Sequence, residues 1–282
     1  MTVDLDEGAG IGAWDLRAAR HAVTAVLRRR PEAYHARLLA EGGRVGSEGP
    51  DSIHDHLRAR EAGLAEYLQY DGYERRSALV RCLPVAATAA TWAAGGGPDL
   101  GDPAAPAAVT ALADGRLETH SEVRLDGHEV RLTKAVSLGG GRLDPWLGVE
   151  LGVENRSPAG LRVRLGLEWA MTMLGGGGNP QAWWELGGSR TAHDAAGSGT
   201  RVSRLGQGND WLGVIIATAV EPAADAWWAP IETVSNSEGG VERVYQGSAL
   251  LLSWVVDVAP GATWRATVQH AARIASERVL EG

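Results

Sequence analysis

The sequence IETVSNSEGGVERVYQGSALLLSWVV, residues 231–256, contains the pattern that decides the fold. It opens with the mostly apolar and β-branched residues 231–234, passes through a turn cluster with two glycines, and continues in the alternating run 241–246. Alternation is typical of a half-buried strand, and a glycine-containing cluster between two such runs is typical of a turn. A break at Gly247 and Ser248 precedes the nearly continuous apolar segment 249–256. The stretch therefore predicts successive antiparallel strands joined by turns.

Carboxylates and aromatic rings gather in this stretch and just before it. A sugar-binding surface needs this mixture, because the C–H faces of a pyranose stack on aromatic rings while its hydroxyls bond to carboxylates and amides. The candidate carbohydrate contacts in this region are Trp227, Trp228, Glu232, Glu238, Glu242 and Tyr245.

Three further candidates precede this region. Trp183 and Trp184 follow the four-glycine loop 175–178, and Glu168 stands within the otherwise apolar run 161–173. Adjacent residues of a strand point to opposite faces, so one ring of each Trp pair can pack in the core while the other contacts a ligand. Because the chain has 11 Trp and no Phe, burial of both pairs as ordinary core packing is the alternative interpretation.

The carboxylates also allow two interpretations. Paired carboxylates perform glycoside hydrolysis, but a sequence does not give the ~5–9 Å separation that this mechanism needs. Solvated or structural carboxylates are therefore the favoured interpretation of Glu168 and of the glutamates in the 231–256 stretch.

Composition and charge exclude several classes of protein. The formal net charge is −8 and the only basic run is 28–30, so nucleic-acid binding is not expected. No apolar run approaches the ~20 residues of a membrane-spanning helix. The N-terminus lacks the pattern of a signal peptide, and we expect a cytoplasmic protein. The single Cys82 excludes an intrachain disulfide.

Cofactor and metal motifs are not found either. The glycine loop 175–178 is not a nucleotide-binding fingerprint, because no GxGxxG or GxxxxGK[ST] pattern is present. His54 and His56 would point about 200° apart on a helix, which is poor geometry for one ion. We therefore predict no cofactor and no metal site.

The start of the chain has a helical character. Apolar residues at roughly helical spacing predict a helix over 14–30, which Pro31 breaks, and another helical turn over 31–39. Asp51 or Ser52 can cap a further helix that runs to about Tyr67.

From Arg75 onward the sequence reads as short strands separated by turns. Asp126 and Gly127 are a strong hairpin signal, and the Ala/Gly/Pro-rich segment 86–110 predicts a long loop. Short strands at this spacing favour a β-sandwich. Besides the 231–256 stretch, the predicted strands cover 77–83, 116–125, 128–138, 146–154, 161–173, 182–186, 201–205, 211–220 and 264–274.

Three segments together resemble a known family. They read RRRPEAYH (28–35), SIHDHLRAREAGLAEYLQYDGYERRSALV (52–80) and WAPIETVSNSEGGVERVYQGSALLLSW (228–254). In this order they resemble the C-terminal domain of the α-amylase/4-α-glucanotransferase group of glycoside hydrolase family 57. The resemblance implies a galactose-mutarotase-like β-sandwich, or supersandwich, that forms one domain over 1–282. Its helix-containing N-terminal part is expected at 1–74 and its β-sandwich at 75–282.

The resemblance also implies a function. The family's catalytic carboxylates belong to an N-terminal barrel that this chain does not contain, so no catalytic residue is assigned. The chain is expected to be a non-catalytic domain that contacts an α-1,4-glucan or maltooligosaccharide and supports such a barrel, which stands either upstream in the same polypeptide or on a separate chain. Arg–carboxylate pairing between segments 28–35 and 70–76 is expected to pin the N-terminal part to the sheet.

Three alternatives stay open. The chain is the back end of a longer enzyme whose function needs the upstream half. It is an autonomous mutarotase-like epimerase, which requires a His acid and a carboxylate base on one face, with His120 beside Glu118 or Glu122 pointing inward. Or it is a structural or interaction module whose Trp side chains are all buried.

Overall fold

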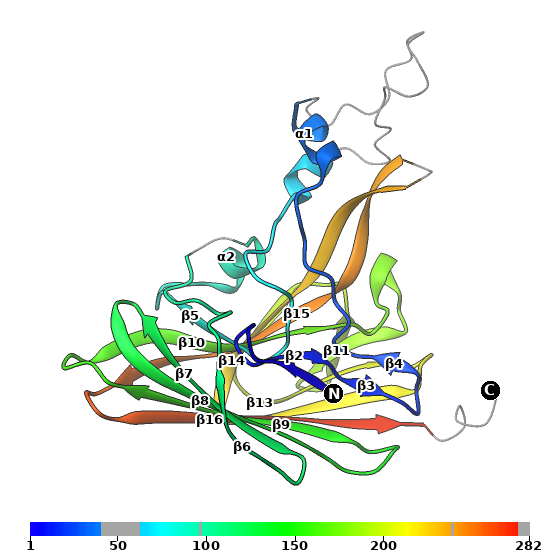
Figure 1. The fold of residues 1–282 in the computed structure, drawn as a ribbon. Helices are drawn as coiled ribbons and strands as arrows, with labels where there is room; N and C mark the ends of the chain where they lie inside the picture. Colours follow the sequence, from blue (N-terminus) through cyan, green and yellow to red (C-terminus); the bar gives the residue numbers. More distant parts are fainter. Residues whose placement is uncertain (41–62, 96–97, 238–239, 276–282) are drawn as a thin grey trace.

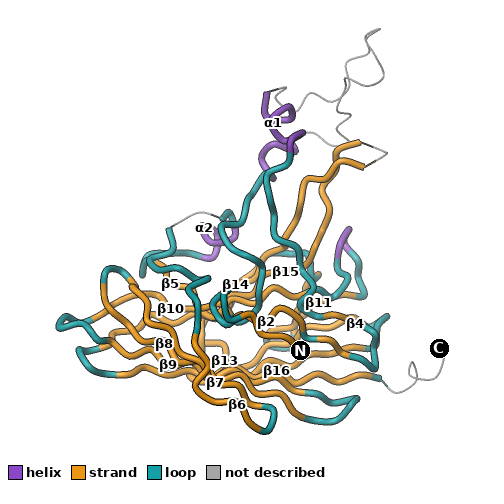
Figure 2. The backbone as a smooth tube through the Cα atoms, viewed as in Figure 1, coloured by secondary structure: helices purple, strands orange, loops and turns teal. Residues whose placement is uncertain are grey.

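The computed structural model describes residues 1–40, 63–95, 98–237 and 240–275 (Figure 1). Strands make up most of these residues, and helices are few and short (Figure 2). The prediction of a mostly β protein is confirmed. Glu238, the His54 and His56 pair and most of the helix predicted to end near Tyr67 lie outside the described residues.

The strands range in length from two residues to 24 residues, and the longest one takes part in both layers. The helical elements are α1 (Ala33–Ala40), α2 (Ala89–Ala93) and the 3-10 helices η1 (Leu64–Tyr67) and η2 (Gly176–Gly178). The strands are β1 (Thr2–Asp4), β2 (Gly10–Ala13), β3 (Asp15–Leu16), β4 (His21–Ala22), β5 (Leu79–Leu83), β6 (Ala108–Ala113), β7 (Arg116–Leu125), β8 (His128–Gly139), β9 (Trp146–Asn155), β10 (Leu161–Met171), β11 (Ala182–Leu186), β12 (Ser189–Ala192), β13 (Gly197–Asn209), β14 (Val214–Ser237), β15 (Gly240–Val258) and β16 (Thr263–Ile274).

Twelve of the described strands form one continuous antiparallel sheet that folds into two layers. One layer runs β6-β7-β8-β9-β16, and the other runs β5-β10-β15. Strand β14 joins them, because residues 214–221 pair with β16 while residues 225–237 pair with β15. Figure 1 shows β5, β10 and β15 above β8, β9 and β16. The predicted β-sandwich is therefore present.

The main core lies between the two layers. Alternate residues of β9 and β10, such as Leu151, Val153, Leu165 and Leu167, point into it and are fully buried. This is the period of two that a strand imposes on its side chains. The other face of β10 is buried as well. Segments on either side of β5, among them 70–75, α2 and 99–103, cover it and create the site described below (Figure 1).

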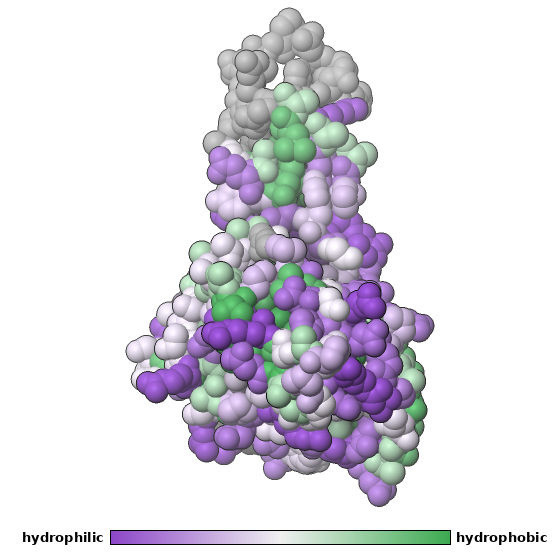
Figure 3. Space-filling model, turned by 90° about the vertical axis from the view of Figure 1, so that its left-hand side faces the viewer, coloured by the Kyte–Doolittle hydropathy of each residue, from purple (hydrophilic) through white to green (hydrophobic). Residues whose placement is uncertain are grey.

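A projection stands on the β5-β10-β15 layer. The last part of β14 and the first part of β15 extend beyond the layer as a two-stranded hairpin, and α1 and η1 pack against it (Figures 1 and 2). Leu38, Leu64, Val234 and Val241 form a small apolar core inside this projection. In the space-filling view it is a narrow column with apolar side chains visible in its middle (Figure 3).

The local signals of the sequence predicted many elements correctly. The hairpin at Asp126 and Gly127 joins β7 and β8, and both residues have the positive φ that such a two-residue turn requires. Helix α1 lies at the helical turn predicted over 31–39, but it begins two residues later and ends one residue later. The loop predicted over 86–110 contains the short helix α2 and the first residues of β6.

The helix predicted over 14–30 was wrong. The segment forms the short strands β3 and β4 with turns between and after them. Trp14, Leu16 and Ala18 are buried while Asp15 and Arg17 are exposed. This alternation is the strand period, and it places the three apolar side chains on the main core.

The break predicted at Gly247 and Ser248 was also wrong, because both residues lie within the continuous strand β15. A Cβ atom on Gly247 would lie 2.8 Å from the carbonyl oxygen of Met171 and 2.7 Å from a methyl carbon of Val26. The glycine therefore permits a close approach of neighbouring segments rather than a turn. In the part of the chain that the structure describes, no helix is long and apolar enough to cross a membrane.

Candidate functional site

A polar cavity of about 360 Å³ lies on the outer face of the β5-β10-β15 layer, and we call it the Glu168 cavity. Its volume is within the ~300–1,000 Å³ of small-molecule sites. Its floor comes from β5, β10, β14 and β15, and its walls come from the segments around Arg29, 70–75, α2 and 99–103. The lining residues are Arg29, Tyr70, Asp71, Gly72, Tyr73, Arg75, Arg81, Leu83, Trp92, Ala93, Gly95, Asp99, Gly101, Asp102, Pro103, Glu168, Ala229, Pro230, Ile231 and Ala249.

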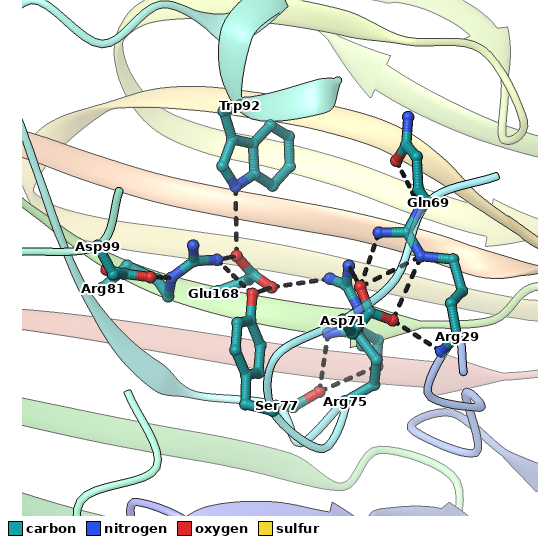
Figure 4. A network of polar contacts seen from close by, with 11 residues as sticks. Arg29, Gln69, Asp71, Arg75, Ser77, Arg81, Trp92, Asp99 and Glu168 are labelled. Carbon is teal, nitrogen blue, oxygen red and sulfur yellow. Dashed lines mark hydrogen bonds and ion pairs between the residues drawn. The ribbon is translucent and has the colours of Figure 1, made fainter. Parts of the chain in front are cut away.

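Glu168 of β10 lies at the bottom of this cavity and is 1% exposed. One carboxylate oxygen, Oε1, accepts hydrogen bonds from Arg75 Nη1 and from the Tyr73 hydroxyl, both at 2.9 Å. The other oxygen, Oε2, accepts from Arg81 Nη1 and, at 3.2 Å, from the Trp92 indole N–H. Figure 4 shows Arg75 and Arg81 reaching the carboxylate from two sides and Trp92 reaching it from above. Both oxygens are therefore fully engaged.

These donors decide the charge of the buried carboxyl group. Burial alone raises the pKa of Glu168, but the guanidinium groups of Arg81 and Arg75, with the hydrogen bonds from Tyr73 and Trp92, hold that pKa below its usual value. Opposite charges and hydrogen bonds to the ionised form favour ionisation. Glu168 is thus a fixed anion and a poor general acid.

The network extends to both sides of Glu168 as an alternating chain of arginines and carboxylates (Figure 4). On one side Arg75 also pairs with Asp71, which accepts from Arg29 Nη2 at 2.7 Å. On the other side Arg81 Nε donates to Asp99 at 2.6 Å. Burial raises the pKa of Asp71, but Arg75 and Arg29 outweigh it and lower this pKa to about 2. The expected pairing between segments 28–35 and 70–76 is confirmed.

Backbone contacts bring the segment 71–77 over β10. The Asp71 N–H donates to the Arg29 carbonyl at 3.0 Å, and Ser77 exchanges two hydrogen bonds with the backbone of Ala170 through its hydroxyl. Strand β5 then pairs with β10, where Leu79 lies opposite Glu168. The arginines at 75 and 81 therefore reach Glu168 from the two ends of one connected segment.

The chemistry of the cavity favours binding over catalysis. Its three guanidinium groups are each paired with a carboxylate, so charge inside the cavity is nearly balanced. Among the described residues no group of three or more His, Cys, Asp or Glu side chains could hold a metal ion. A neutral ligand with hydroxyl groups suits this lining best.

The two Trp pairs are distributed as the strand geometry predicts, but both members of each pair are buried, with exposed fractions of 2–6%. Trp184 and Trp228 belong to the main core. Trp227 points to the opposite face, where the Arg164 guanidinium lies 4.8 Å from its ring centre. Trp183 is likewise covered by Arg190, 3.6 Å from the ring centre. None of the four rings presents an open face.

The structure places the remaining candidates apart from Glu168. Glu232 accepts from Arg243 at 3.4 Å and Glu242 from the Ser237 hydroxyl at 2.9 Å, both on the projecting hairpin. The Tyr245 hydroxyl lies 2.7 Å from Nδ1 of the buried His193. Of the candidates that the structure describes, only Glu168 lines the cavity.

Several residues of the cavity were missed by the sequence analysis. Trp92 lies in the segment that was predicted as a loop, and Arg81 and Asp99 lie outside the segments 28–35 and 70–76 for which pairing was expected. The one usable signal for Trp92 was an isolated large aromatic residue in an Ala/Gly-rich segment.

His120 does not meet the condition of the epimerase alternative. It shares the outer face of its layer with Glu118 and Glu122, whereas the next residue toward the core, Thr119, is buried. Both carboxylates are paired, Glu118 with Arg116 at 2.8 Å and Glu122 with Arg131 at 2.6 Å. His120 thus points away from the main core, and the carboxylates that line a cavity of about 220 Å³ with it, Glu118 and Glu150, are both paired with Arg116.

Comparison with known proteins decides the family. The family model "Alpha-amylase/4-alpha-glucanotransferase, C-terminal" matches residues 1–268. The chain belongs to this family. It is therefore a C-terminal domain of the α-amylase/4-α-glucanotransferase type, as the three segments quoted from the sequence indicated.

The relatives of this C-terminal domain are longer proteins. Alpha-amylase 1 of Dictyoglomus thermophilum is 27% identical, over 94% of this chain and 37% of the relative. The crystal structure of the 4-alpha-glucanotransferase from Thermococcus litoralis matches with a TM-score of 0.71 at 16% identity, over 97% of this chain and 35% of that one. The domain thus spans little more than a third of the length of these relatives.

A third match concerns the fold alone. A galactose mutarotase-like protein from Clostridium acetobutylicum matches with a TM-score of 0.53 at 8% identity, over 97% of this chain and 92% of that one. The prediction of a galactose-mutarotase-like β-sandwich is confirmed.

Proposed function

We propose that this C-terminal domain is non-catalytic and that it supports the catalytic barrel of an α-glucan-acting enzyme of glycoside hydrolase family 57 while contacting an α-1,4-glucan. The names of its relatives support the substrate class, since they are an alpha-amylase and a 4-alpha-glucanotransferase. The share of those relatives that the domain spans, little more than a third, leaves room for a barrel in the same polypeptide or in a separate partner chain.

The state of Glu168 is the observation that carries the non-catalytic assignment. Glycoside hydrolysis needs one carboxyl group that gives up a proton and a second that attacks or activates water. Glu168 is held as an anion by two arginines, and neither oxygen is free to attack. The nearest cavity carboxylates, Asp71 and Asp99, are paired in the same way.

We propose a single domain over residues 1–282. The described residues of the N-terminal part, 1–74, are held to the β-sandwich, 75–282, through the ion pair of Asp71 with Arg75 and the hydrogen bond from Tyr73 to Glu168. We also propose a cytoplasmic location, in keeping with the single, unpaired Cys82.

Product analysis tests the proposal. The purified chain is incubated with maltoheptaose, and its binding to maltoheptaose is measured by titration calorimetry. We expect binding without any longer or shorter maltooligosaccharide. New products would overturn the non-catalytic assignment.

A structural module without sugar binding is the second candidate function. The burial of Trp183, Trp184, Trp227 and Trp228 favours it, because these rings then serve as packing alone. The same titration separates the two, since a structural module binds no maltoheptaose.

A further inference from the structure

We propose that the Glu168 cavity is the glucan-contact site, with Trp92 and Tyr70 as its two aromatic walls and Glu168 as the residue that positions Trp92. The proposal rests on the glucan contact of the proposed function and gives it a location. None of the four tryptophans predicted from sequence lines this cavity.

Trp92 has the properties of a fixed stacking surface. It is half-buried, it lines the cavity from α2, and its indole N–H is held by Glu168 at 3.2 Å. Its ring also packs on Trp227, with 6.3 Å between ring centres. Helix α2 is fixed at its start by the reciprocal bonds of Thr88 and Thr91. An aromatic face that is ordered before binding loses little entropy when a ligand arrives.

Tyr70 supplies the second aromatic surface. It is 43% exposed, and its hydroxyl lies 3.1 Å from Nδ1 of His35. The Nε2 atom of His35 donates to the Val234 carbonyl at 3.0 Å, so Nδ1 is the acceptor for the Tyr70 hydroxyl. The imidazole also stacks on the Tyr70 ring, 5.7 Å between centres. The projection thus fixes one wall of the cavity, and the sandwich fixes the other.

The charges of the cavity select a neutral ligand. Arg29, Arg75 and Arg81 are all paired with carboxylates, so an anionic ligand would have to displace a carboxylate of the protein itself. Asp102 keeps hydrogen-bonding capacity, because its Oδ1 accepts from the Ala104 N–H at 2.9 Å while its Oδ2 has no partner among the described residues. Two aromatic walls, guanidinium groups that are all paired and a free acceptor suit a sugar ring.

A second cavity lies beside the first. A cavity of about 190 Å³ at the base of the projection shares Arg29 and Tyr70 with it, and its further lining includes Gln69, Thr233 and Gln246. These amide and hydroxyl groups suit further sugar hydroxyls. The proposal therefore places the further rings of a linear oligosaccharide that starts beside Trp92 past Tyr70, in this second cavity. Affinity is expected to rise from maltose to maltoheptaose.

Titration calorimetry of the full chain with maltoheptaose tests the location. Trp92→Ala is expected to weaken binding about tenfold and Tyr70→Ala about threefold, because each removes one stacking surface. Trp92→Phe keeps an aromatic face but loses the hydrogen bond to Glu168, so its affinity is expected to lie between those of the parent and of Trp92→Ala. Trp211→Ala, which removes a ring that is 58% exposed and does not line the cavity, is the matched control and should bind as the parent does.

A double-mutant cycle tests the role of Glu168. If Glu168 acts through the Trp92 N–H, Glu168→Gln weakens binding in the parent chain but causes no further loss in the Trp92→Phe chain. An equal loss in both backgrounds would show a general structural role and overturn the positioning role. Should Glu168→Gln fail to fold, Trp92→Phe alone decides, since parent-like affinity would show that the hydrogen bond is not needed.

The outcomes separate the site from the function. If the parent chain binds maltoheptaose and Trp92→Ala binds equally well, the cavity is the wrong site while the glucan contact stands. If the parent chain binds neither maltoheptaose nor glycogen, the glucan contact fails and the site fails with it.

Discussion

Strand β10 is buried on both faces, but the two faces are covered by different chemistry. Its inner face presents Leu165, Leu167 and Trp169 to the opposite layer of the sandwich. Its outer face presents Glu168 to Arg75, in the segment that precedes β5, and to Arg81 of β5. Residues that alternate along a single strand thus take part in an apolar core and in an ion-pair network.

The two faces of β10 therefore have different structural roles. Apolar burial is non-directional and scales with the area removed from water, so the inner face holds the layers together without fixing any polar group in space. An ion-pair network is directional, and it adds little net stability once desolvation is counted. Its value on the outer face is geometric, because it fixes Trp92, Arg75 and Arg81 around a cavity.

The largest expected effect comes from disrupting the ion-pair network on the outer face. Glu168→Ala leaves Arg75 and Arg81 buried with one partner fewer each, and we expect a loss of about 3–5 kcal/mol in the free energy of unfolding. Urea denaturation measures this loss. Glu129→Ala is the matched control, since its pair with Arg124 is exposed on both sides and should contribute at most about 1 kcal/mol. Equal effects of the two changes would contradict the account of the network.

Truncation of a core side chain disrupts the apolar packing on the inner face. Leu165→Ala removes a fully buried side chain and leaves a cavity, for an expected loss of about 3 kcal/mol. Hydrogen exchange distinguishes it from Glu168→Ala. The core variant should raise exchange throughout both layers, whereas the Glu168 variant should raise it mainly over 69–76 and α2. The same exchange pattern in both variants would show that the two faces are not independent.

The pH dependence of the free energy of unfolding separates the two faces, because a group with its own titration range lies at each face. His270 lies on β16 in the opposite layer and packs against Trp169 of the inner face, with 4.1 Å between ring centres. Burial lowers the pKa of His270 to about 3. Its folded pKa is below its unfolded value, so its stability contribution is complete above about pH 6.5 and is lost as the pH falls through about 3. Unfolding free energy measured against pH should flatten over this range in His270→Gln.

Asp71 gives the smaller acid effect, on the outer face. Its folded pKa of about 2 is below the unfolded value of 3.8, so its contribution is complete above about pH 4 and is lost as the pH falls through 2. We expect about 2 kcal/mol over this range. Asp71→Asn should abolish this part of the pH dependence and leave the part due to His270 unchanged. An unchanged profile below pH 4 would contradict the pairing of Asp71 with Arg29 and Arg75.

Sequence patterns predicted the sandwich better than the site. The hairpin at Asp126 and Gly127 is set by two adjacent residues, so a local signal was sufficient. The segment 14–30 was misread because several of its apolar residues also fit a helical spacing, while contact with the core selects the extended form of Trp14 and Leu16.

The cavity could be predicted only in part, for a different reason. The family resemblance and the expected Arg–carboxylate pairing pointed to segments 28–35 and 70–76, and Glu168 was noticed as a carboxylate in an apolar strand. Trp92 and Arg81 reach Glu168 from 76 and 87 residues away in sequence. No local pattern records contacts of this length. The burial of the outward Trp183 and Trp227 likewise depends on arginines that only the folded chain brings to them.

Titration of Glu168 is the direct test of whether this side chain is a fixed, paired anion. NMR of the labelled side-chain carboxyl carbon, followed against pH in the intact chain, gives the pKa of this group. The account predicts that Glu168 stays ionised where an ordinary glutamate, with a pKa of about 4.3, is half protonated. A pKa above that value would contradict a fixed, paired anion, and it would make Glu168 a candidate general acid instead of the residue that holds Trp92 in place.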